Sequence, residues 1–148
     1  MLLAAFGLFV AGPPAQAQLQ TFPTAQLTIA TASGPHEFTI EVATTPAQQQ
    51  QGLMYRPHLA ADAGMLFDFG HPIMATFWMK NTLIPLDMLF VGENGRIVNI
   101  HERAVPESTD IIASTAPVRA VIELTGGTAD RLDITPGDRV IYPIFGAK

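Results

Sequence analysis

Residues 77–90, FWMKNTLIPLDMLF, combine a mostly apolar stretch with three polar side chains that could do chemistry. Lys80 supplies a cation, Asn81 an amide and Asp87 a carboxylate, and each is costly to bury without a partner. Trp78 adds a large aromatic face beside them. This set could orient a small polar ligand by hydrogen bonds and stack on a sugar ring. The same charges could instead neutralise one another and only hold a turn.

The elements that position these residues begin with a hairpin around Asn94-Gly95, a pair typical of a two-residue type I′ turn. Such a turn fixes the register. It would pair Glu93 with Arg96, Val91 with Val98, Leu89 with Ile100 and Asp87 with Glu102. Two carboxylates directly opposite each other are destabilising. The sequence therefore predicts a relieving feature: a cation, a metal ion, a shared proton or a shift of register.

Lys80 is the first candidate to relieve Asp87, because residues 81–85 could turn the chain back and bring the two together. Arg56, in the segment GLMYRP, is the second. We therefore expect Asp87 to form an ion pair with one of them. Asn81 suits the corner between the two strands, since its side chain can bond its own backbone and it tolerates left-handed geometry.

A catalytic alternative uses the carboxylates of Asp87, Glu102 and Glu123 as an acid and base pair, as in a glycosidase. Any three acidic residues permit that hypothesis, so its specificity is low. The sequence contains no G-x-S-x-G, P-loop or G-x-G-x-x-G motif, and its four histidines lack metal-site spacing. We expect no cofactor and no metal.

The periodicity predicts an α+β fold that is mainly β, a small rolled sheet or partial β-barrel with one or two short helices. Strands are expected at QLTIAT and HEFTIEVA, and a helix with Thr45 as N-cap, Gln48 in a capping box and Gly52 as C-cap. Further strand-length runs are GMLFDF, IMATFWM, LDMLFV, RIVNIHE, VRAVIELT and RVIYPI, with one helical turn at TADRLDI.

Composition limits the function classes. The 148 residues carry only eight Lys plus Arg and a net charge of −5, which argues against a nucleic-acid surface. There is no cysteine, so disulfides, thiolate nucleophiles and cysteine zinc sites are excluded.

The N-terminus resembles a signal peptide, with an apolar stretch followed by Ala15-Gln16-Ala17, although it lacks the usual initial Lys or Arg. We expect residues 1–17 to be a signal peptide, 18–26 a linker and 27–148 one β-rich domain. Cleavage near Ala17 would leave no stable membrane span and a periplasmic or secreted protein.

The motifs GLMYR, GMLFDF, FWMKNTLIPLDMLF, GRIVNI, VIELTGG and PGDRV occur in this order. Together they resemble the bacterial and archaeal family called domain of unknown function one-ninety-two, over about residues 27–145. The resemblance implies a compact β-rich fold, frequent export and no established activity. It implies Arg56, Trp78, Lys80, Asn81, Asp87 and Glu123 as site candidates without catalytic roles. The Glu-Arg pair usual before G-L-M is replaced here by glutamines 48–51, which we interpret as a solvated helical surface.

Three hypotheses follow for the function. The leading one is an exported domain that binds a small polar or carbohydrate-like ligand near residues 78–87. The second is a hydrolase or lyase that uses the carboxylates. The third is a protein-interaction module with a purely structural charge cluster. An exposed Trp78 in a pocket favours binding, two carboxylates facing one cavity favour catalysis, and a fully paired cluster without a cavity favours the third.

Overall fold

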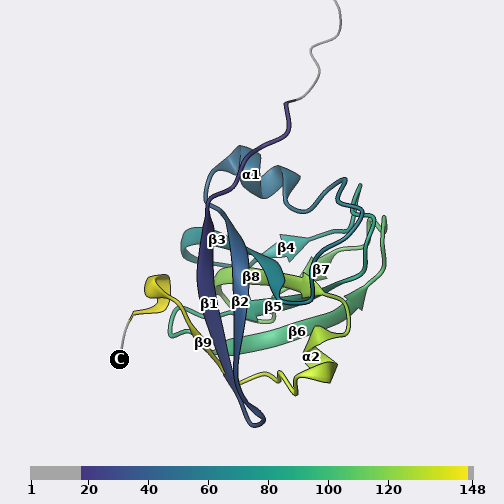
Figure 1. The fold of residues 1–148 in the computed structure, drawn as a ribbon. Coiled ribbons are helices and arrows are strands. Elements are labelled where there is room, and N and C mark those ends of the chain that lie inside the picture. The colour runs from purple at the N-terminus through teal and green to yellow at the C-terminus, as the bar shows by residue number, and fades with distance from the viewer. Residues whose placement is uncertain (1–17, 147–148) are drawn as a thin grey trace, which may run out of the picture.

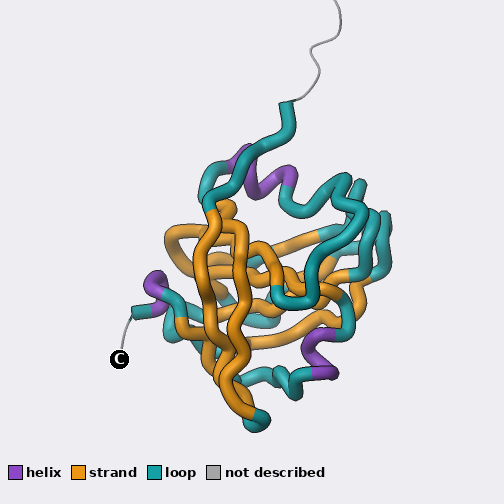
Figure 2. Tube along the Cα trace, viewed as in Figure 1, coloured by secondary structure: helices purple, strands orange, loops and turns teal. Residues whose placement is uncertain are grey.

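The computed structural model describes residues 18–146, which form nine strands and two short α-helices (Figures 1 and 2). In chain order the elements are β1 (Thr24–Thr31), β2 (Gly34–Ala43), α1 (Pro46–Gln51), β3 (Ala63–Ile73), β4 (Thr76–Phe77), β5 (Leu86–Val91), β6 (Ile97–Ala104), β7 (Ile112–Ala113), β8 (Val118–Thr125), α2 (Thr128–Arg131) and β9 (Arg139–Ile141), before a 3₁₀ turn at Pro143–Phe145. Neither α-helix of this region is long and apolar enough to cross a membrane.

Seven strands form one sheet in the order β6-β5-β8-β3-β2-β1-β9, which curls into a half-barrel. Neighbours in the sheet are antiparallel except for β2 and β3, which are parallel. The predicted fold class, a mainly β α+β fold with a rolled sheet and short helices, is confirmed.

The two edge strands of the half-barrel meet at one end. The amide of Ile97 donates to the carbonyl of Asp138 at 3.0 Å, and the amide of Val140 donates to the carbonyl of Gly95 at 2.8 Å. Gly95 has a φ of +77°, and a Cβ placed there would lie 2.9 Å from the carbonyl oxygen of Val140. Only glycine therefore satisfies both the backbone conformation and the close approach of the two edges.

Side-chain alternation along the strands separates two apolar layers. The inner layer includes Ile97 and Val140 from the two edge strands, together with Leu89 and Ile122 from the middle of the sheet. The outer face carries the second layer, which lies under the small β4–β7 ribbon and the segment after α1. Its buried members include Met65, Phe67, Met79, Met88, Phe90 and Val121. The candidate site lies on this outer side.

Several local predictions are confirmed. The helix α1 has Thr45 as its N-cap, a capping box with Gln48 and a C-cap at Gly52. Strands form at both N-terminal segments, with β1 starting at Thr24, inside the predicted linker. The run at 73–79 does not form one strand, because β3 extends to Ile73 and only residues 76–77 pair, with the unpredicted strand β7.

The predicted type I′ turn is wrong. The amide of Gly95 donates to the carbonyl of Gly92, and Gly95 has a positive φ whereas Asn94 does not. Leu89 pairs with Ile100 as predicted, but Val91 pairs with Ile97 instead of Val98. The longer loop shifts the register by one residue at this end of the hairpin.

A second register shift lies at Asp87, and it replaces the predicted ion pair. Leu86 pairs with Ala104 and Met88 with His101, so two residues of β6 stand opposite Asp87. Glu102 is exposed in this bulge, and Arg103 takes a left-handed φ of +48°. A register shift, one of the four expected forms of relief, therefore keeps the carboxylates apart.

The buried Asp87 carboxylate binds backbone amides. Oδ1 accepts from the amides of Arg103 at 2.8 Å and Gly127 at 3.0 Å, and Oδ2 accepts from the amide of Ala129 at 2.8 Å. No ion pair joins Asp87 to a cation among residues 18–146, so the prediction of an ion pair with Lys80 or Arg56 is wrong. Through these hydrogen bonds the carboxylate connects β6 and the start of α2 to β5.

Replacing Asp87 with alanine should therefore destabilise the fold strongly. The change leaves three amides without their acceptor, and each buried amide left without a partner costs about 1–3 kcal/mol. The matched control is Asp130→Ala, because Asp130 lies in α2 but forms only an exposed ion pair with Arg103. Urea denaturation should give a loss below about 1 kcal/mol for the control. Equal losses for the two variants would contradict this account of Asp87.

Candidate functional site

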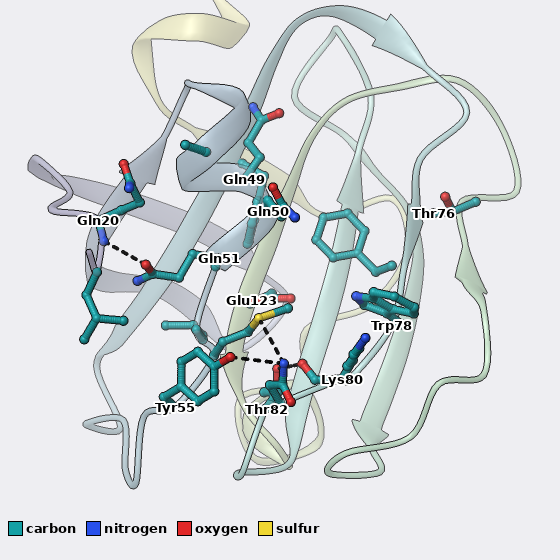
Figure 3. Close-up of a pocket in the computed structure, with 18 of the residues that line it drawn as sticks. Gln20, Gln49, Gln50, Gln51, Tyr55, Thr76, Trp78, Lys80, Thr82 and Glu123 are labelled. Atoms are coloured by element: carbon teal, nitrogen blue, oxygen red, sulfur yellow. Dashed lines mark hydrogen bonds between the residues drawn. The ribbon is translucent and has the colours of Figure 1, made fainter. Parts of the chain in front are cut away.

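A pocket of about 660 Å³ opens on the outer side of the sheet. Its walls come from four parts of the chain: the segment 18–20, α1 with the turn after it, the middle of β3, and residues 76–82. Glu123 of β8 completes the lining (Figure 3). The lining residues are Gln18, Leu19, Gln20, Ala47, Gln49, Gln50, Gln51, Gly52, Leu53, Met54, Tyr55, Phe67, Phe69, Thr76, Phe77, Trp78, Lys80, Asn81, Thr82 and Glu123.

Aromatic side chains form much of the pocket. Phe77 of β4 packs edge-on against Phe67 of β3, with ring centroids 5.0 Å apart, and lies 6.5 Å from the ring of Phe69. Trp78 lines the same pocket and is 45% exposed. The packed phenylalanine rings shape the pocket, while Trp78 keeps an accessible face for a ligand.

Lys80 lies beside Trp78. Its Nζ is 5.1 Å from the centroid of the Trp78 ring, within the range of a cation–π interaction. The side chain forms no ion pair within the described residues. Lys80 therefore brings an exposed positive charge to the pocket.

Tyr55 and Asn81 join the two loops that frame the pocket. The Tyr55 amide donates to the Asn81 carbonyl at 2.9 Å, and Asn81 Nδ2 donates to the Tyr55 hydroxyl at 3.2 Å. Both residues have left-handed backbones, with φ of +66° and +57°. Such conformations cost free energy and persist where surrounding contacts hold them, often at functional sites.

Glu123 places a carboxyl group inside the pocket from the centre of the sheet. It pairs in register with Met65 on one side and Met88 on the other, and its side chain is only 4% exposed. No hydrogen bond or ion pair is formed by this carboxyl within residues 18–146. Within residues 18–146, every side-chain oxygen that is fully shielded from solvent has a hydrogen-bond partner. Because the Glu123 carboxyl has no partner, its oxygens must be accessible from the pocket.

The environment of Glu123 changes its chemistry. Burial raises the pKa of its carboxyl from 4.5 to about 8, because no neighbouring cation compensates for the lost hydration. The group is therefore mainly protonated at pH 7. It can donate a hydrogen bond, or it can lose its proton when a cation approaches.

Four of the predicted site residues line the pocket, namely Trp78, Lys80, Asn81 and Glu123, and three do not. Arg56 instead forms a bidentate ion pair with Glu41, at 2.8 and 2.9 Å. Asp87 pairs with Leu124 in the sheet, so strand alternation places it on the face opposite Glu123. Glu102 is exposed and lies outside the pocket. The three carboxylates therefore do not converge on one cavity.

The prediction that glutamines 48–51 form a solvated helical surface is wrong, because several of them bind other segments and line the pocket. Gln49 Nε2 donates to the carbonyls of Ala43 and Asp68, and Gln51 Oε1 accepts from the amide of Gln20 at 2.7 Å. Gln49, Gln50 and Gln51 all line the pocket. The sequence offered no signal for this, because four consecutive glutamines show no apolar periodicity.

Metal-ligating side chains do not cluster here: no group of three or more His, Asp or Glu residues within 18–146 is arranged to hold a metal ion. The chemistry available in the pocket is therefore hydrogen bonding, aromatic stacking, the charge of Lys80 and the proton of Glu123.

The raised pKa predicts how stability depends on pH. Glu123 ionises near pH 4.5 in the unfolded chain and near 8 in the folded protein, so its contribution is fully favourable below 4.5 and is lost as pH rises to 8. The loss reaches about 1.4 kcal/mol per pH unit. Glu123→Gln should remove this component of the slope between pH 5 and 8, measured by urea denaturation. The control Glu102→Gln alters an exposed carboxyl and should keep the parent slope, whereas equal slopes for all three proteins would refute the assignment.

Comparison with known proteins places the chain in a family. The profile of DUF192, described as "Uncharacterized ACR", matches residues 27–142. A protein of unknown function from Novosphingobium aromaticivorans DSM 12444 is 43% identical, with a TM-score of 0.81 over 89% of this chain and 94% of that chain. A Sinorhizobium meliloti 1021 protein described as a "putative transcription regulator" is 49% identical, with a TM-score of 0.80 over 84% of this chain and 97% of that chain.

The search of curated proteins gave no match. The family match nevertheless spans well over half of the chain, and it contains the string around Trp78 and Lys80 that carried the resemblance. The chain belongs to the DUF192 family.

Proposed function

We propose that this protein is an exported binding domain whose pocket takes a small polar or carbohydrate-like ligand. The observation that carries the proposal is the half-exposed Trp78 at a pocket of about 660 Å³, within the usual size range of small-molecule sites. Lys80 supplies a charge and Glu123 an unpartnered carboxyl in the same pocket. A concave aromatic surface with a few polar groups suits a binding site.

Catalysis by paired carboxylates has less support. A glycosidase-type mechanism needs two carboxyl groups on either side of one bond, about 5–10 Å apart. Glu123 alone of the three candidates lines the pocket, while Asp87 holds backbone amides on the other face of the sheet. A purely structural charge cluster is also disfavoured, because Lys80 and Glu123 do not neutralise each other and a cavity is present.

The Sinorhizobium meliloti relative is described as a "putative transcription regulator", but we do not propose nucleic-acid binding for this chain. The net charge is −5, and three of the eight basic side chains, Arg56, Arg103 and Arg119, form ion pairs with carboxylates. Phosphate backbones require several unpaired cations on one surface.

Export is supported by the sequence of residues 1–17, which lie outside the described region. The apolar segment and Ala15-Gln16-Ala17 are typical of a cleaved signal peptide. The amide of Gln20 donates to Gln51 Oε1 of α1. Cleavage near Ala17 would leave this contact intact.

The binding proposal predicts separate effects on affinity and stability. A screen of small polar compounds and sugars by thermal shift should find one that raises the melting temperature of the protein. Trp78→Ala should weaken that compound at least about tenfold, the equivalent of about 1.4 kcal/mol, and Lys80→Met should change its affinity in the direction set by the charge of the compound, both with little change in ligand-free stability. The matched control is Arg131→Met, an exposed cation outside the pocket. Strong destabilisation by both pocket variants, with no compound bound by the parent protein, would exclude a binding site.

Export predicts a processed N-terminus. N-terminal sequencing of the protein from the periplasm or medium of its host should begin near Gln18. Intact Met1 in a cytoplasmic fraction would refute the proposal.

A further inference from the structure

We infer that the ligand of this pocket carries a cationic amine, which binds between the Glu123 carboxyl and the surrounding aromatic side chains. The inference rests on the proposed binding function and names the chemical class of its ligand. An ammonium group supplies the counter-ion that the buried carboxyl lacks, and a cation for the aromatic faces of the pocket that Lys80 does not cover.

The first supporting observation is the isolation of Glu123. Its neighbours across the sheet are the side chains of Met65 and Met88, neither of which can neutralise a carboxylate. The residue is 4% exposed and reaches the pocket without any protein partner among residues 18–146. Buried carboxyl groups are normally hydrogen-bonded or paired, as Asp87 is in the same domain. Glu123 therefore lacks one partner, which a ligand can provide.

The second observation is the aromatic surface around the pocket. Tyr55, Phe67, Phe77 and Trp78 all line it. Cations bind favourably over such rings, best over tryptophan, and the interaction strengthens when water is excluded. The protein already uses one ring in this way, since Lys80 Nζ lies 5.1 Å from the Trp78 centroid.

The other polar groups of the pocket favour an amine over a ligand with many hydroxyl groups. Gln49 Nε2 is already bound to two backbone carbonyls, and Gln51 Oε1 accepts from Gln20. Asn81 Nδ2 donates to Tyr55. A ligand with many hydroxyl groups would compete with these protein contacts for Gln49 Nε2, Gln51 Oε1 and Asn81 Nδ2, whereas one ammonium needs only the Glu123 carboxyl and aromatic faces.

Binding of an amine should release a proton. In the free protein the Glu123 carboxyl is mainly protonated at pH 7, because burial raises its pKa to about 8. When the ammonium ion binds, the carboxyl passes its proton to the buffer and the carboxylate pairs with the ammonium, so charge and protons balance. The other titratable groups lining the pocket are Lys80 and Tyr55; the Met65 and Met88 neighbours do not titrate. Apparent affinity should therefore rise up to about tenfold per pH unit between 6 and 8.

Isothermal titration calorimetry with three probes tests this inference: phenethylamine, its neutral analogue 2-phenylethanol, and methyl β-glucoside. We expect phenethylamine to bind at least tenfold more tightly than either neutral probe. Titrations at pH 7 in phosphate and in Tris should reveal close to one proton released, because the two buffers have different ionisation enthalpies. Glu123→Gln keeps the side-chain shape and should abolish both the preference and the proton release.

Two variants serve as controls. Lys80→Met should keep the proton release and strengthen amine binding several-fold, because it removes a repelling charge from the pocket. Glu102→Gln, an exposed carboxyl away from the pocket, should behave as the parent protein.

Each remaining outcome contradicts the inference. Unchanged amine binding in Glu123→Gln, or binding without proton release, would overturn it. If a neutral probe binds as tightly as phenethylamine and depends on Trp78, the inference is wrong while the proposed function stands. If none of the three probes binds and the broad compound screen also finds no ligand, both the inference and the proposed function fail.

Discussion

The hydrogen bonds that the Asp87 carboxylate accepts from backbone amides are the interaction on which the rest of the domain depends. One buried carboxylate accepts three backbone amides, from Arg103 in β6 and from Gly127 and Ala129 at the start of α2. These segments are distant in sequence, and without the carboxylate their amides would be buried without an acceptor. The same contacts fix the β6 bulge, which in turn sends Glu102 to the surface. One side chain thus joins the β6 bulge and the start of α2 to β5 at one end of the half-barrel.

The sheet holds a second buried acid with the opposite character. Asp87 and Glu123 lie on neighbouring strands, but alternation directs them to opposite faces, and their surroundings differ accordingly. Asp87 is fully hydrogen-bonded on the inner side, whereas Glu123 meets methionines and the pocket on the outer side. A satisfied buried carboxylate stabilises a fold, while an unsatisfied one in a cavity is a candidate functional group. This contrast distinguishes Asp87, which has a structural role, from Glu123, which belongs to the candidate site.

The covering layer of the outer face shapes the pocket. Strand pairing supplies the base of that layer, but α1 and the loops around residues 55 and 81 supply its walls. Tyr55 and Asn81 both have left-handed conformations, and each hydrogen-bonds the other. Their loops therefore hold each other in place beside Trp78, whose ring stays accessible. A pre-formed pocket lowers the ordering cost of binding.

Local chemistry in the sequence determined much of the fold. The capping residues Thr45, Gln48 and Gly52 act within one helix, and apolar alternation at residues 38–42 acts within one strand, so both predicted their elements correctly. The site was only partly predictable, because its members meet through long-range pairing. Pairing of β5 with β8 decided that Glu123 and Asp87 face opposite sides, and the fold brought the amides of residues 103, 127 and 129 to the Asp87 carboxylate. Neither follows from spacing along the chain, since a one-residue shift in register reverses the face of every side chain.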